Sequence, residues 1–155
     1  MSKIKIKSLF SILTAKLILF LSKRIFKGGS SFPGKVALKF DSNILSVVAK
    51  NYKVILVTGT NGKTTTTSMI YNIIKKSGNR VITNSTGANM LPGITATFID
   101  NYKIFGKKKP AYAVIEVDEA NLKFITKYIS PEIITITNLF RDQLDRYGEV
   151  YTTLA

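Results

Sequence analysis

The sequence predicts an α/β fold with a parallel β-sheet, preceded by a helical segment. Aliphatic, strand-like runs recur at residues 54–57, 80–83, 111–115 and 133–136, and stretches with helical spacing of apolar residues separate them. Strands that alternate with helices in this way form parallel sheets with right-handed crossovers. With 155 residues and 45% hydrophobic content, the chain has room for one domain with a sizeable core.

The formal net charge of +14 is unevenly distributed along the chain. Residues 1–53 hold eleven Lys and Arg against the single acid Asp41, whereas residues 54–155 hold twelve against eight acids. There is no nucleic-acid-binding module and no basic-aromatic repeat beside this excess, so we expect no nucleic-acid partner. Because Cys and His are both absent, disulfides and thiolate metal sites are excluded, and a metal would need oxygen ligands. This composition agrees with a cytoplasmic protein.

The N-terminal segment combines basic residues with an apolar run. Lys3, Lys5 and Lys7 precede the run at residues 9–21, which is shorter than the about 20 apolar residues that span a bilayer. We expect a helix that either covers the core or rests on a membrane surface. A signal or anchor is the third possibility, although no small-x-small cleavage site follows. Residues 28–34, with Pro33-Gly34, are expected to form a loop before a second helix near residues 43–50.

The residues that follow the first strand have the pattern of a phosphate-binding loop. A strand, a Gly-rich turn and a helix N-terminus place backbone N–H groups and a lysine around an anion. The first glycine of G-x-x-x-x-G-K-[ST] would fall at Val57, so an ordinary Gly-rich turn is the alternative. Gly78 is expected to end the helix. The expected nucleotide-binding residues here are Gly59, Thr60, Asn61, Gly62, Lys63, Thr64 and Thr65.

Two later segments are candidates for further parts of a site. The polar loop at residues 84–93 is either a substrate-contacting loop or a connector, and a helix is expected from Ile94 to Phe105. The strand at residues 111–115 ends in Glu116, which we predict to hold Mg²⁺ together with Thr64. The alternative is a cluster of acids at a helix start, which suits Asp118 and Glu119 better than Glu116.

Together these residues resemble the central ATPase domain of the Mur ligase family. The run Gly59-Thr60-Asn61-Gly62-Lys63-Thr64-Thr65 is similar to that family's phosphate loop, including its shortened glycine spacing. Asn138-x-x-x-Asp142-x-x-Asp145-Arg146-Tyr147 resembles its second signature, and Asn138 is counted among the expected nucleotide-binding residues. The resemblance covers roughly residues 50–150. It implies a Mur-type P-loop ATPase domain over residues 51–155, incomplete at its C-terminus, after a basic helical segment at residues 1–50.

Within the family, the sequence is most similar to the ligase-like subunits that amidate lipid II. The similar features are the short basic lead, residues 84–89, residues 116–120 and Gln143. Gln143 replaces the metal-binding histidine usual in amino-acid-adding members, which weakens transfer of a second metal site to this position. The remaining ATPase strands, the C-terminal domain and the zinc site of this subgroup are expected beyond residue 155.

The resemblance implies an ATP-dependent ligase that works with a glutaminase subunit (GatD-like). It would phosphorylate the D-glutamate α-carboxylate of the lipid II stem peptide, and ammonia would attack the acyl phosphate. Lys63 and Glu116 are the expected catalytic residues, ATP and Mg²⁺ the cofactors, and Thr64 and Glu116 the metal ligands. The alternatives are a folylpolyglutamate or cyanophycin synthetase type of ligase and a non-catalytic scaffold fragment. We also hypothesise that residues 1–27 contact the inner membrane face.

Overall fold

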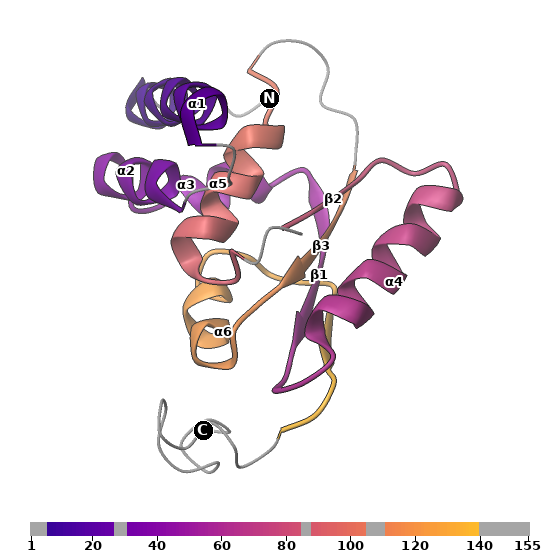
Figure 1. The fold of residues 1–155 in the computed structure, drawn as a ribbon. Coiled ribbons are helices and arrows are strands. Elements are labelled where there is room, and N and C mark those ends of the chain that lie inside the picture. The colour runs from indigo at the N-terminus through magenta and orange to yellow at the C-terminus, as the bar shows by residue number, and fades with distance from the viewer. Residues whose placement is uncertain (1–5, 27–30, 85–87, 105–110, 140–155) are drawn as a thin grey trace.

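The computed structural model describes residues 6–26, 31–84, 88–104 and 111–139 (Figure 1). The chain begins with three helices, α1 (Ile6–Phe26), α2 (Phe32–Phe40) and α3 (Ile44–Ala49). Strands and helices then alternate in the order β1 (Tyr52–Thr58), α4 (Lys63–Lys76), β2 (Val81–Thr83), α5 (Leu91–Asn101), β3 (Ala111–Glu116), α6 (Glu119–Ile125) and β4 (Ile133–Ile136). The predicted α/β architecture is confirmed.

The four strands form one parallel sheet in the order β2-β3-β1-β4. β1 lies inside the sheet, where Leu56 pairs with Ile115 of β3 and with Ile134 of β4. Because all strands run in the same direction, the carboxyl ends of β1, β3 and β4 meet at one edge of the sheet. Among the described strands β4 is an edge, and its Ile133, Ile134 and Ile136 are exposed.

Helices cover both faces of the sheet, as Figure 1 shows. On one face, Ile55 and Val57 of β1 pack with Ile70 and Ile74 of α4. On the other face, alternate residues such as Leu56 join a larger core with α5 and α6. Successive residues of β1 point to opposite faces of the sheet, and both faces are buried. The sequence of β1 is therefore an unbroken aliphatic run.

The N-terminal helices pack against α5 on this second face. One side of α1 is buried, and its Ile12 and Ala15 are completely inaccessible to solvent. Ser11 donates a hydrogen bond to the Ala37 carbonyl of α2 at 2.9 Å, and Ser8 donates one to Asp41 at 2.6 Å. The inner side of α1 therefore covers the core, as one of the sequence alternatives expected. The predicted domain boundary at residue 50 stays a prediction. The hydrophobic core includes residues from both sides of this boundary.

The predicted loop at Pro33-Gly34 is wrong, since these residues form the first turn of α2. Proline is well suited to the first turn, where its missing N–H would have no helical partner. Gly34 is required by packing, because a Cβ there would overlap the carbonyl of Pro92 at the start of α5. Pro92 and Gly93 likewise lie in the first turn of α5, so the loop predicted for residues 84–93 is shorter than expected. In both segments Pro and Gly mark a helix start rather than a break.

Across the described residues, none of the helices has both the length and the apolar character that crossing a membrane requires.

Candidate functional site

The phosphate loop lies between β1 and α4, at the edge where the carboxyl ends of the strands meet. Gly59 and Gly62 have positive φ angles of 123° and 81°, which glycine adopts readily. Gly62 is the N-cap of α4 and provides no side-chain cap to the helix. The first-turn N–H groups of an α-helix have no partner within the helix and attract anions. The loop and the start of α4 thus have the geometry expected of the anion site that the sequence predicts.

Gly59 is also required by the close approach of the chain after β4. A Cβ at Gly59 would stand 2.6 Å from the carbonyl oxygen of Asn138 and 2.9 Å from its nitrogen, and would also overlap the Thr137 hydroxyl. This contact gives a physical reason for a glycine at position 59. The residues directly after β4 therefore lie tightly against the loop.

The residues after β4 hold the loop through several hydrogen bonds. The Asn138 side chain accepts one from the Asn61 N–H at 2.9 Å and donates one to the Asn61 carbonyl at 3.0 Å. Thr137 donates to the same carbonyl at 2.7 Å, and the Thr60 N–H donates to the Asn138 carbonyl at 2.9 Å. Asn138, which was predicted to bind nucleotide, therefore lies beside the loop, and the Asn138 side chain supports the loop backbone.

Gly59→Ala is expected to abolish nucleotide binding and to lower the melting temperature by several degrees. The new methyl group has no room beside Asn138. Residue 59 also has a positive φ angle, at which L-residues are strained by roughly 1–2 kcal/mol. Gly78→Ala is the matched control, because Gly78 has a φ of 80° but open space around it. Melting curves that show the same loss for both variants would contradict the role given to this close approach.

Thr64 and Glu116 come together as predicted. The Thr64 hydroxyl, in the first turn of α4, donates a hydrogen bond of 2.8 Å to the Glu116 carboxylate at the end of β3. Glu116 is buried, so its charge lies in an environment with little water. A hydroxyl and a carboxylate oxygen are ligands that suit Mg²⁺, which takes few protein ligands and relies on phosphates for the rest. Among the described residues no group of three or more His, Cys, Asp or Glu gathers to hold a metal alone.

Asn84, the first residue of the candidate substrate loop, fixes the position of Glu116. Its side-chain oxygen accepts from the Glu116 N–H at 2.9 Å, and its side-chain nitrogen donates to the Glu116 carbonyl at 2.8 Å. Asn84 is itself buried and follows β2 directly. An asparagine at the carboxyl end of a strand was the available signal, but only the neighbouring position of β2 and β3 reveals the contact.

In an isolated helix, Lys63 would be exposed at the helix start. In this structure its side chain is instead largely enclosed. Its side chain is only 13% exposed, and its Nζ lies 3.5 Å from the Glu119 carboxylate. It also donates hydrogen bonds to the carbonyls of Gly59 and Thr60. The Glu119 side chain is 8% exposed, and within the described residues its oxygens accept no hydrogen bond. Glu119 thus balances the charge of Lys63 inside the loop.

The remaining predicted residues are placed as follows. Thr65 is exposed in the first turn of α4, and Asn61 is exposed in the loop. Asp118 is the N-cap of α6 and accepts from the Ala120 N–H at 3.2 Å, so the helix-start interpretation holds for this acid. Gln143, the second signature after Asn138, and residues 85–87 of the candidate substrate loop lie outside the described residues.

Comparisons with known proteins agree with this geometry. The sequence profile of the Mur ligase middle domain matches residues 57–153. The chain is 47% identical to the lipid II isoglutaminyl synthase (glutamine-hydrolyzing) subunit MurT of Streptococcus pneumoniae, over 96% of this chain and 32% of that protein. It is 39% identical to the MurT subunit of Staphylococcus aureus, over 88% of this chain and 30% of that protein. The chain therefore spans about a third of the length of these relatives.

The fold also matches a solved Mur ligase. MurF ligase from Thermotoga maritima, crystallised in complex with ADP, superposes with a TM-score of 0.63 and 20% identity, over 76% of this chain and 27% of that one. At this identity the match concerns the fold alone. The profile match extends over more than half of the chain and begins within β1, the strand that leads into the phosphate loop. The chain therefore belongs to the Mur ligase family, with residues 57–153 matching its middle domain.

Proposed function

We propose that this chain binds Mg²⁺-ATP at the phosphate loop and serves as part of an ATP-dependent carbon-nitrogen ligase. The observation that carries this proposal is the 2.8 Å contact between Thr64 and Glu116, beside an α4 N-terminus without a side-chain cap. Lys63, held at the same loop by Glu119, adds a positive charge for the β- and γ-phosphates. Mg²⁺ bound by Thr64 and Glu116 would neutralise charge on the phosphates during transfer.

The proposed reaction is the amidation of a carboxylate through an acyl phosphate. A carboxylate oxygen attacks the γ-phosphorus of ATP, the bond to the β-phosphate oxygen breaks, and ADP leaves. Ammonia then attacks the carbonyl carbon, loses a proton, and expels inorganic phosphate. The chain's own contribution is positional and electrostatic: the first-turn N–H groups of α4 orient the phosphates, Lys63 balances their charge, and Asn84 holds the strand end that carries Glu116.

We further propose the substrate and partner from the MurT relatives. Their names describe a subunit of a glutamine-hydrolysing lipid II isoglutaminyl synthase. For this chain we infer the D-glutamate α-carboxylate of lipid II as the substrate and a GatD-like glutaminase subunit as the source of ammonia. Support comes from the extent of the similarity, which covers 96% of this chain and so includes most of the N-terminal helices as well as the ATPase segment.

An isotope-transfer experiment tests the acyl phosphate. The chain is combined with ATP, Mg²⁺, glutamine, a GatD-like glutaminase and lipid II whose α-carboxylate carries ¹⁸O. Formation of an acyl phosphate moves one ¹⁸O atom into the inorganic phosphate, which mass spectrometry detects. Amidated lipid II with unlabelled phosphate would contradict the acyl phosphate. Mg²⁺-ATP binding without amidation would limit the function of this chain to nucleotide binding.

A further inference from the structure

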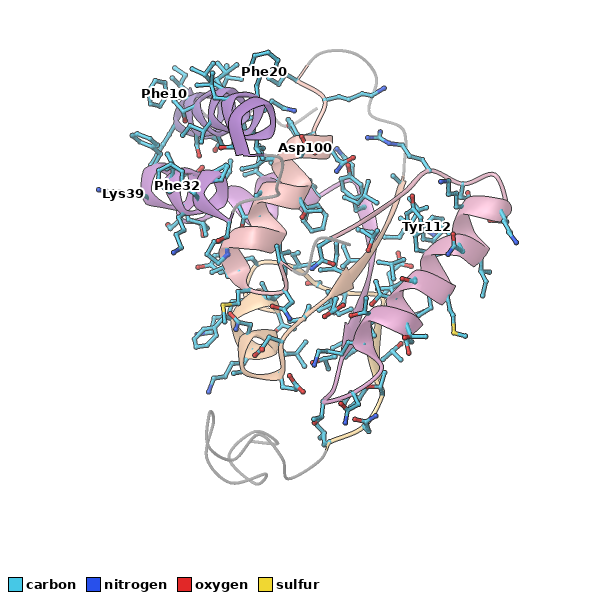
Figure 2. The ribbon with its side chains drawn as sticks, in the orientation of Figure 1. Phe10, Phe20, Phe32, Lys39, Asp100 and Tyr112 are labelled. Atoms are coloured by element: carbon cyan, nitrogen blue, oxygen red, sulfur yellow. The ribbon has the colours of Figure 1, made fainter. Side chains whose placement is uncertain are left out.

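Helix α1 is apolar on two opposite sides, only one of which faces the core. The inner side packs on α2 and α5, as described above. The outer side presents six large apolar side chains that are between 47% and 87% exposed: Ile6, Phe10, Leu13, Leu17, Phe20 and Leu21. Their spacing of three and four residues places them in one stripe along the helix. Figure 2 shows Phe10 and Phe20 at the end of the molecule that lies away from α4.

Helix α2 widens this stripe into a surface. Phe32 and Phe40 are 57% and 42% exposed, and the Phe40 ring contacts the Phe10 ring edge to face, with 5.3 Å between their centroids. We call this surface, formed by the six α1 side chains with Phe32 and Phe40, the outer apolar face. Apolar side chains that gather on the surface of a soluble protein commonly mark a site of protein or membrane interaction.

The exposed charges that α1 and α2 themselves place beside the outer apolar face, among the described residues, are all positive. Lys7, Lys35 and Lys39 are exposed on α1 and α2, and Lys35 and Lys39 share the side of α2 that carries Phe32. No acid occurs in α1 or α2. The neighbouring Asp41 is buried and accepts hydrogen bonds from Ser8 and from the Asn43 N–H. A second copy of this face would therefore bring lysines against lysines, whereas an anionic surface complements them.

We propose that the outer apolar face lies on the surface of an anionic lipid bilayer. Helices that combine apolar side chains with flanking lysines bury the apolar groups at the boundary of headgroups and acyl chains. Each nearby lysine adds an attraction to anionic headgroups that salt screens within a Debye length. A face built from two adjacent helices suits a flat surface better than the narrow seam that a single partner helix requires. The inference does not depend on the proposed ligase activity.

Vesicle sedimentation of the 155-residue chain tests this proposal. We expect binding to vesicles that contain phosphatidylglycerol, a loss of binding of at least tenfold as salt rises from about 0.05 to 0.5 M, and no binding to phosphatidylcholine vesicles. Leu17→Ser/Phe20→Ser should weaken binding at least tenfold. Met69→Ser/Ile73→Ser is the matched control, because these α4 residues are equally exposed, at 62% and 69%, and this variant should bind like the parent chain.

A second variant keeps the proposal testable if the serine variant does not fold. Lys35→Gln/Lys39→Gln changes only exposed lysines, so it should retain the melting temperature, weaken binding to anionic vesicles and reduce its dependence on salt. Equal binding to neutral vesicles, or equal loss in the α4 control, would overturn the proposal. A dimer that is seen in sedimentation velocity and that Leu17→Ser/Phe20→Ser dissociates would also overturn the proposal, because the face would then be an interface between copies.

Discussion

Lys63→Ala is expected to lower the affinity of the chain for ATP by at least tenfold. Hydrogen bonds to charged groups contribute about 1.5–3 kcal/mol, and each 1.4 kcal/mol is a factor of ten in the dissociation constant. Lys63 starts α4 and is already held at the loop, so its ammonium needs little rearrangement to reach a phosphate. Calorimetric titration with ATP and Mg²⁺ measures the change. Unchanged affinity would remove the phosphate role of Lys63.

The same substitution has a second expected effect, because it leaves the enclosed Glu119 carboxylate without its counter-charge. Breaking a buried ion pair from one side destabilises a protein more than replacing both partners does. We therefore expect a lower melting temperature for Lys63→Ala and a partial recovery for Lys63→Ala/Glu119→Gln. ATP binding should stay weak in the double variant, which separates the loss of the phosphate contact from a loss of stability.

Glu116→Gln is expected to weaken binding of Mg²⁺-ATP at least tenfold more than binding of metal-free ATP. Glutamine keeps the size of the side chain and an oxygen that accepts from Thr64, but it lacks the charge that attracts the metal. Titrations with and without Mg²⁺ give the ratio of the two affinities. Glu132→Gln, at an exposed glutamate outside the site, is the matched control. An equal effect on both nucleotide forms would mean that Glu116 has only a structural role.

The phosphate loop and the parallel sheet were predictable because their signals are local. An aliphatic run, two glycines and a helical pattern adjoin one another in sequence. The observed β1 and α4 agree closely with the strand and the helix that these signals predict. The contact between Thr64 and Glu116 also followed from topology, since strand ends of a parallel sheet meet at one edge. In these cases the residue pattern and the general rules for parallel sheets were sufficient.

What the sequence did not reveal depends on contacts between distant segments. Pro33-Gly34 resembles a loop until α5 is known to cross it at Pro92. Asn84 is an ordinary polar residue until β2 is placed beside β3. Lys63 is enclosed because Glu119 lies beside it. Glu119 is 56 positions further along the chain and belongs to α6, on the other face of the sheet from α4. Such contacts are set by tertiary packing, which local propensity does not encode.

The edge that β4 forms among the described strands has a consequence for handling this protein. Ile133-Ile134-Thr135-Ile136 is a short, uncharged and β-branched strand, and its isoleucines are exposed. An edge strand of this composition offers its outward backbone N–H and C=O groups for pairing with other chains. Natural edge strands counter this hazard with a lysine or a proline, neither of which β4 contains. Concentrated solutions of the chain should therefore form β-rich assemblies that grow from this edge, independently of nucleotide and of lipid.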